Sequence, residues 1–109
     1  MNLHPGEVVL IRIGFHQMPG GKLRPAVVLL DTLDDDFVAA PITSRPRVSN
    51  FDVPINQWRD AGLNTASTIR AHKLTVLAKA EIVRRLGELA KADRIALSEL
   101  LVRAFSLSP

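Results

Sequence analysis

Side chains suited to phosphate chemistry occur at three separate places in this sequence. Arg24 precedes a proline beside a glycine-rich stretch, Thr43 and Ser44 follow an apolar run, and Arg70 stands two positions before His72. An arginine fork binds two phosphate oxygens, a hydroxyl donates to an oxygen, and histidine exchanges protons near neutral pH. These groups suit RNA cleavage without a metal, in which the 2′-hydroxyl attacks the adjacent phosphorus and the protein supplies a base, an acid and cations.

The distribution of charge bears on the same chemistry. The formal net charge is +3, and no Asp or Glu occurs in residues 8–30, 37–51 or 61–80. If these windows converge in the fold, they form a surface that attracts anions. Alternatively, these windows are half-buried strands with few charges of either sign. The candidate side chains would then lie in solvated strand ends and turns. The basic residues of the three windows are Arg12, Lys22, Arg24, Arg45, Arg47, Arg70, Lys73 and Lys79.

Metal chemistry has little support in the sequence. His4, His16 and His72 lack the spacing of metal ligands, cysteine is absent, and the carboxylates of 34–36 fall in a predicted turn. Two-metal nucleases need carboxylates that converge on the phosphate, and the basic windows contain none. We therefore expect no metal site and no cofactor, and we expect any RNA cleavage to be independent of metal.

Length and composition predict one globular domain over residues 1–109. Apolar residues make up 47 % of the chain, and no apolar run approaches the roughly 20 residues of a membrane-spanning helix. The N-terminal residues lack the basic start and cleavage site of a signal peptide. We expect a cytoplasmic protein that does not associate with a membrane.

The elements that must position these side chains are short strands bounded by glycine and proline. Strands are predicted over residues 6–15, 23–31, 37–43, 51–55, 67–77 and 80–89. On the fifth of these strands Arg70 and His72 would share a face, because alternate residues point to the same side. Pro25 is expected at the start of its strand or at a sheet edge, since proline cannot donate to a ladder.

Three further segments complete the predicted architecture. Residues 16–22 are expected to form a turn broken at Pro19–Gly21, and 56–62 one or two helical turns from an Asn56 N-cap to a Gly62 stop. Residues 91–105 carry a single apolar stripe and are predicted as a helix. The fold class is therefore mainly β with a C-terminal helix, as a small barrel or sandwich.

At the level of ordered motifs, the sequence resembles the MazF/PemK toxins of type II toxin–antitoxin systems. The segments that carry the resemblance are GEVVLIRIGF, KLRPAVVLLD, FVAAPITSRPR, DVPINQWRDAGLN, STIRAHKLTVL and IVRRLGEL, in that order along nearly the whole chain. The resemblance implies a small SH3-like β-barrel and a homodimer. It also implies metal-independent cleavage of single-stranded RNA at short sequences, which leaves a cyclic phosphate and a 5′-hydroxyl. A cognate antitoxin would inhibit by laying an extended tail across the RNA-binding groove.

The resemblance also assigns roles to particular residues. It places the family's active-site arginine on Arg24 and its hydroxyl residue on Thr43. Some members carry Arg-x-Asp where this chain has Arg70-Ala71-His72, so His72 becomes a candidate base or an RNA-binding residue. His16 is a second candidate proton carrier. The residues predicted to bind RNA are His16, Lys22, Ser44, Arg45, Arg70 and Lys73.

Three other functions are weaker. Gyrase-poisoning toxins share this barrel but act through C-terminal residues that include a tryptophan, whereas this chain ends AFSLSP and its single tryptophan is Trp58. An inactive RNA- or protein-binding relative is a second alternative, although Arg24 and Thr43 are both present. A DNA-binding module would need a recognition helix, and the C-terminal helix has an apolar stripe that requires burial.

Overall fold

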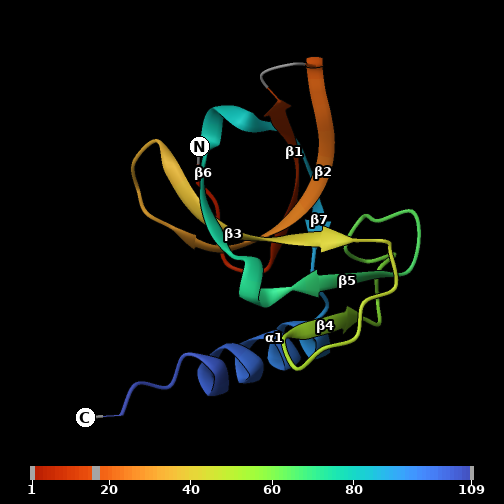
Figure 1. Cartoon of the computed structure of the whole chain (residues 1–109), viewed down its shortest axis with the longest axis vertical. Helices are drawn as coiled ribbons and strands as arrows, with labels where there is room; N and C mark the ends of the chain where they lie inside the picture. The colour runs from red at the N-terminus through yellow and green to blue at the C-terminus, as the bar shows by residue number, and fades with distance from the viewer. Residues whose placement is uncertain (1, 16–17, 109) are drawn as a thin grey trace.

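The computed structural model describes residues 2–15 and 18–108. At residues 14, 15 and 18–20 it describes the backbone alone. In the described part of the chain the strands are β1 (Glu7–Phe15), β2 (Met18–Asp31), β3 (Asp36–Thr43), β4 (Asp52–Ile55), β5 (Ser67–Arg70), β6 (Thr75–Ala78) and β7 (Ile82–Glu88). The 3₁₀ turns η1 (Ala71–Lys73) and η2 (Lys79–Glu81) precede β6 and β7, and α1 (Lys91–Ala104) ends the fold (Figure 1). The predicted mainly β fold with a C-terminal helix is confirmed.

Every ladder of the sheet is antiparallel. The strand order is β4-β5-β3-β2-β1-β7, and β6 pairs with β3 beyond the end of β5. No ladder between described residues closes this order into a complete ring, so the sheet curls without joining its ends. None of the helices formed by the described residues is long and apolar enough to cross a membrane.

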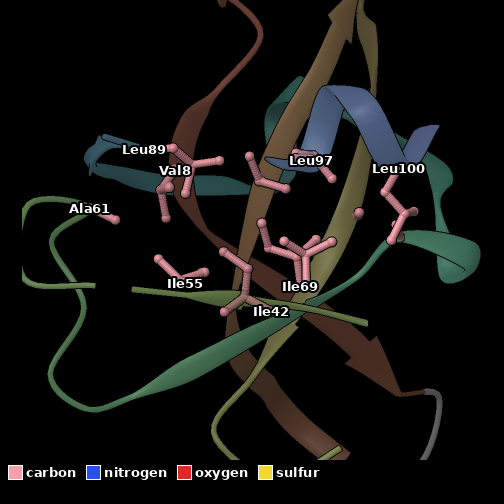
Figure 2. Packing of buried hydrophobic residues seen from close by; sticks show 12 residues of the cluster. Val8, Ile42, Ile55, Ala61, Ile69, Leu89, Leu97 and Leu100 are labelled. Carbon is pink, nitrogen blue, oxygen red and sulfur yellow. The ribbon is translucent and has the colours of Figure 1, made fainter. Parts of the chain in front are cut away.

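Two apolar clusters lie on opposite faces of the central strands. Neighbouring residues Val8 and Val9 of β1 belong to different clusters, as the alternation of a strand requires. The first cluster fills the space between the sheet and α1, which contributes Leu97 and Leu100 (Figure 2). The second is enclosed by the curl of β1, β2 and β3, with Phe37 as its largest fully buried side chain. The helix therefore belongs to the core.

The strand predicted over 67–77 is in fact two strands separated by η1. Ile42 and Ala39 are three positions apart on β3, but their partners Ile69 and Thr75 are six positions apart. The extra residues cannot pair with β3, and they form η1. Arg70 therefore ends a strand, whereas His72 lies in a 3₁₀ turn, and the prediction that the two share one strand face is wrong.

The break predicted at Pro19–Gly21 is also wrong, because β2 already begins at Met18 and runs through it. Gly21 has φ +61°, and a Cβ there would lie 2.5 Å from the carbonyl oxygen of Ile13. Glycine thus permits an irregular, close stretch of the β1–β2 ladder and does not end the strand. Pro25 consequently lies inside β2, next to Ala26, where pairing with β3 begins.

The segment 56–62 forms a turn where helical turns were predicted. Asn56 is not a helix N-cap: its N–H donates to Oδ1 of Asp93 at 3.0 Å, and the N–H of Gln57 donates to Oδ2 at 2.9 Å. Gly62 therefore ends a turn and not a helix, with φ +80° and hydrogen bonds from Gly62 and Leu63 back to Arg59 and Trp58. The strand and helix predicted over 80–89 and 91–105 are confirmed as β7 and α1.

Candidate anion-binding cleft

A cleft of about 660 Å³ opens at the carboxyl end of β3. Its lining includes five arginines and no aspartate or glutamate among the described residues. Hydroxyl and amide groups from Thr43, Ser44, Asn64, Thr65 and Ser67 lie between these cations. Such a lining is suited to a ligand that carries several negative charges. The five arginines are Arg24, Arg45, Arg47, Arg70 and Arg84.

Antiparallel pairing brings distant segments to this cleft. Thr43 pairs with Thr68, so the chain that leaves β3 and the loop that enters β5 project from the same end of the sheet (Figure 1). Arg45 and Arg47 follow β3, whereas Asn64 and Thr65 precede β5. β2 and β7 supply Arg24 and Arg84. The cleft thus collects side chains from all three acid-free windows of the sequence.

Two glycines hold the wall of the cleft against β7. A Cβ on Gly62 would lie 2.0 Å from the carbonyl oxygen of Leu86, and one on Gly87 would lie 2.8 Å from the carbonyl carbon of Ala61. No side chain fits between these backbones. The same turn is fixed to α1 by the buried carboxylate of Asp93, so the loop that carries Asn64 and Thr65 starts from a rigid support.

The hydroxyl of Thr43 organises the turn after β3. Its Oγ1 accepts a hydrogen bond from the backbone N–H of Arg45 at 3.1 Å. Because a hydroxyl can accept and donate together, Thr43 can still donate its proton to an oxygen in the cleft. The interaction also fixes the direction in which the chain carries Ser44 and Arg45 along the cleft wall.

Arg70 reaches the cleft from a buried ion pair. Its Nε donates to Oδ1 of Asp52 at 3.1 Å, and the side chain of Asp52 is 2 % exposed. Burial alone would raise the pKa of Asp52. The neighbouring Ser49, the hydrogen bond and charge of Arg70, and the charge of His72 together hold that pKa below its ordinary value. Asp52 is therefore charged at neutral pH, and Arg70 faces the cleft with its Nε already engaged.

A family model decides what kind of protein carries this cleft. The model for the PemK-like, MazF-like toxin of type II toxin-antitoxin system matches residues 4–105. The chain belongs to this toxin family. The resemblance drawn from the ordered motifs is confirmed. No curated protein sequence matches the chain.

Solved structures of a toxin, an endoribonuclease and a MazE–MazF complex share the fold of this family member. One is a Mycobacterium tuberculosis toxin, MazF-mt6, with 23 % identity and a TM-score of 0.74 over 97 % of this chain and 100 % of that one. Another is an endoribonuclease in complex with its cognate antitoxin from a mycobacterial species, with 20 % identity and a TM-score of 0.79 over 99 % of both chains. A MazE–MazF structure from Deinococcus radiodurans has 21 % identity and a TM-score of 0.76 over 95 % and 96 %.

Only some of the predicted site residues of this MazF/PemK-like chain meet in the cleft. Arg24, Thr43, Ser44, Arg45 and Arg70 all line it. Three others do not. Lys22 lies on β2, Lys73 lies in η1, and the His72 ring packs on Phe51 with centroids 5.6 Å apart. His16 lies outside the described residues.

Arg84 and the loop 62–65 are members of the cleft that sequence reasoning missed. Arg84 stands between Glu81 and Glu88 in the sequence, so it lies outside the acid-free windows. Its pairing with Leu10 of β1 places it beside the cleft, and only the strand register reveals that. Arg47 belonged to a basic window, but nothing in its local sequence distinguished it from a solvated charge. Asn64 and Thr65 carried the ordinary signal of a turn.

Proposed function

We propose that this protein is a metal-independent endoribonuclease toxin that cuts single-stranded RNA at short sequences in the cytoplasm. The observation that carries the proposal is the cleft, where five arginines and the hydroxyls of Thr43 and Ser44 meet without a carboxylate among the described lining residues. Membership of the MazF/PemK family supports the same reaction class. A polyanionic strand fits a cleft of this charge, and several separate cations can each hold one phosphate.

The proposed reaction needs no nucleophile from the protein. The 2′-oxygen of the RNA forms a bond to phosphorus, the bond from phosphorus to the 5′-oxygen breaks, and the products are a cyclic phosphate and a 5′-hydroxyl. A base removes the 2′ proton, and an acid supplies one to the leaving oxygen. Arg24 stabilises the extra negative charge on the pentavalent phosphorus, and Thr43 donates a hydrogen bond to one of its oxygens.

The general base has two candidates. No described lining residue of the cleft is histidine, aspartate or glutamate, so a side-chain base would have to reach the RNA from the border of the cleft. His72 is exposed beside the segment that carries Arg70, and His16 directly follows Phe15 in the sequence. A histidine base would impose an acidic limb near pH 6–7 on the rate of single-turnover cleavage. Its disappearance in His72→Ala or in His16→Ala would identify the base.

The proposed partners follow from the same cleft. Structures similar to this chain include a toxin bound to its cognate antitoxin and a MazE–MazF complex. We expect a cognate antitoxin with an extended acidic tail that competes with RNA for the arginines. We also expect a homodimer, in support of which α1 exposes the apolar side chains of Ile95 and Val102, and Phe105 is exposed directly after it. Light scattering after size exclusion tests the dimer, and a mass of about 12 kDa at micromolar concentration would contradict it.

The proposed activity is tested with purified protein, a short single-stranded RNA and EDTA. We expect cleavage to continue in the chelator and the new ends to be a cyclic phosphate and a 5′-hydroxyl. Arg24→Ala should abolish most of it, whereas Arg103→Ala, which removes an exposed arginine at the far end of α1, should not. Loss of cleavage in EDTA that magnesium restores would overturn the mechanism. RNA binding without cleavage would indicate an inactive relative. A protein that neither binds nor cleaves RNA would instead favour a toxin that binds a protein such as gyrase.

A further inference from the structure

We propose that Asp52 is a positioning residue, which holds the guanidinium of Arg70 toward the cleft. This inference rests on the proposed RNA-cleaving function. Asp52 and Arg70 are directly opposite each other in the ladder between β4 and β5. The adjacent pair of the same ladder, Val53 with Ile69, is buried in the first apolar cluster. The backbone that carries both charged residues is therefore rigid, and side-chain geometry alone decides where the guanidinium lies.

The two side chains of the pair differ in burial, because Asp52 lies in the interior and Arg70 faces the cleft. The side chain of Asp52 is 2 % exposed, whereas that of Arg70 is 24 % exposed and lines the cleft. Asp52 is not among the lining residues. It does not contact a ligand in the cleft, so it can act on such a ligand only through Arg70 or through its own charge.

The bond to Asp52 leaves the useful face of Arg70 free. Asp52 uses only Nε of the guanidinium. Among the described residues, neither terminal nitrogen of Arg70 forms a hydrogen bond. A guanidinium held by Nε has a fixed plane, and its two terminal nitrogens can bind two oxygens of one phosphate. Without the bond, the long side chain would sample several rotamers, most of which point away from the phosphate.

Stability alone gives a poor reason for a carboxylate in this place. Oδ2 of Asp52 is buried and has no hydrogen-bond partner among the described residues. A buried ion pair with an unsatisfied oxygen is often no more stable than well-packed apolar side chains of the same volume. The pair is therefore better explained by the orientation that it imposes on Arg70.

Positioning and simple electrostatics predict opposite results. If Asp52 were only a counter-ion, its removal would make the cleft more positive, and RNA would bind more tightly. If Asp52 positions Arg70, its removal weakens RNA binding or slows cleavage although the cleft gains positive charge. The sign of the change therefore separates the two roles.

The decisive variant is Asp52→Leu, which keeps the branched shape of the side chain and removes the acceptor. We expect it to lower single-turnover cleavage or RNA affinity by about 10- to 100-fold. Asp52→Asn retains an oxygen that Nε can use, so it should recover part of that loss. Arg70→Gln should behave like Asp52→Leu, and the double variant should be no worse than Arg70→Gln alone. The slope of log affinity against log salt should fall by about 0.7 in each, as for one lost phosphate contact.

Asp31→Asn is the matched control. Asp31 forms a comparably buried ion pair with Lys79 at 2.7 Å, but it stands on the β2–β3 hairpin away from the cleft. It should lower the urea midpoint and leave RNA affinity and turnover unchanged. Asp52→Leu with affinity and turnover at or above wild type would overturn the positioning role, as would additive losses in the double variant.

A second measurement does not depend on RNA. In the wild-type protein the Nε proton of Arg70 should give a sharp NMR signal that exchanges slowly with water, and Asp52→Leu should lose it while Asp31→Asn keeps it. Wild-type protein that neither binds nor cleaves RNA would refute the proposed function, and the NMR signal would then decide the geometry by itself. An unprotected Arg70 signal in the wild type would overturn the positioning proposal.

Discussion

Replacement of Gly62 by alanine tests the support of the cleft more directly than any charge change. Gly62 combines a positive φ of +80° with a backbone contact, since a Cβ would lie 2.0 Å from the carbonyl oxygen of Leu86. Gly6 provides a matched control. It has a similar φ of +94°, but the atoms that a Cβ would meet, at 2.7 and 3.2 Å, belong to the side chain of Arg94.

The two variants therefore share one cost and differ in another. A left-handed backbone costs an alanine about 1–2 kcal/mol, which both variants should show. Arg94 can move its side chain aside, whereas the carbonyl of Leu86 belongs to β7 and can move only with that strand. Forcing a group into a packed site costs about 1–3 kcal/mol more, so Gly62→Ala should lower the free energy of unfolding by about 2–5 kcal/mol. That is a large part of the roughly 5–15 kcal/mol of a small domain.

Urea denaturation followed by fluorescence measures both values. Trp58 is the single tryptophan of the chain. It lies in the same turn as Gly62 and packs against the first apolar cluster. Gly6→Ala corrects for the φ penalty, and the difference between the variants isolates the contact with β7. Equal unfolding free energies for the two variants would refute the argument, as would a Gly62→Ala protein within about 0.5 kcal/mol of wild type.

The arginines of the cleft and two carboxylates outside it give further testable expectations. Arg24→Ala should reduce turnover at saturating RNA about 100- to 1000-fold and leave RNA affinity nearly unchanged. Arg45→Ala should weaken RNA binding and reduce the slope of log affinity against log salt by about 0.7. Single-turnover kinetics at several salt concentrations measure both effects, and a loss of turnover in Arg45→Ala with a loss of affinity in Arg24→Ala would contradict the assignment. Asp93→Asn removes one acceptor from the two partly buried hydrogen bonds to the backbone of Asn56 and Gln57 and should cost about 1–3 kcal/mol in urea, so an unchanged midpoint would contradict the anchoring role. Hydrogen bonding from Lys79 lowers the pKa of Asp31, so its stabilising contribution should be full above the ordinary carboxyl pKa of about 4 and should fade as the pH drops below it. Asp31→Asn should flatten this acid limb, and an acid limb as steep as that of wild type would show that other carboxylates cause it.

Local patterns in the sequence predicted most of the elements. Alternation and β-branched residues located the strands, and the apolar stripe located α1 to within one residue. The errors fall where tertiary pairing overrides local signals. Proline and glycine at 19–21 normally end a strand, but β1 continues to pair with β2 through them. η1 depends on the difference in spacing between β3 and its two partners, which no local pattern contains.

The candidate site was predictable to the extent that it follows from charge. Acid-free windows supplied most of its arginines, because a cleft for polyanions excludes carboxylates from all its walls. Arg84 was not predicted because Glu81 and Glu88 flank its segment in the sequence, although its partner across the ladder, Leu10, is apolar. The pair of Asp52 with Arg70 was not predicted either. These residues are 18 positions apart in the sequence and become partners only through the register of β4 and β5.

The acids of this chain explain why the cleft can be so strongly basic at a net charge of only +3. Four of the eleven acidic residues lie in 31–36, where β2 turns into β3. The cleft lies at the other end of β3, and the seven steps from Asp36 to Thr43 correspond to roughly 23 Å at about 3.3 Å per residue. That separation exceeds the Debye length of about 8 Å at physiological salt, so these acids do not neutralise the cleft. One hairpin thus separates the two signs of charge, and it leaves Asp52 as the carboxylate that balances an arginine of the site from within.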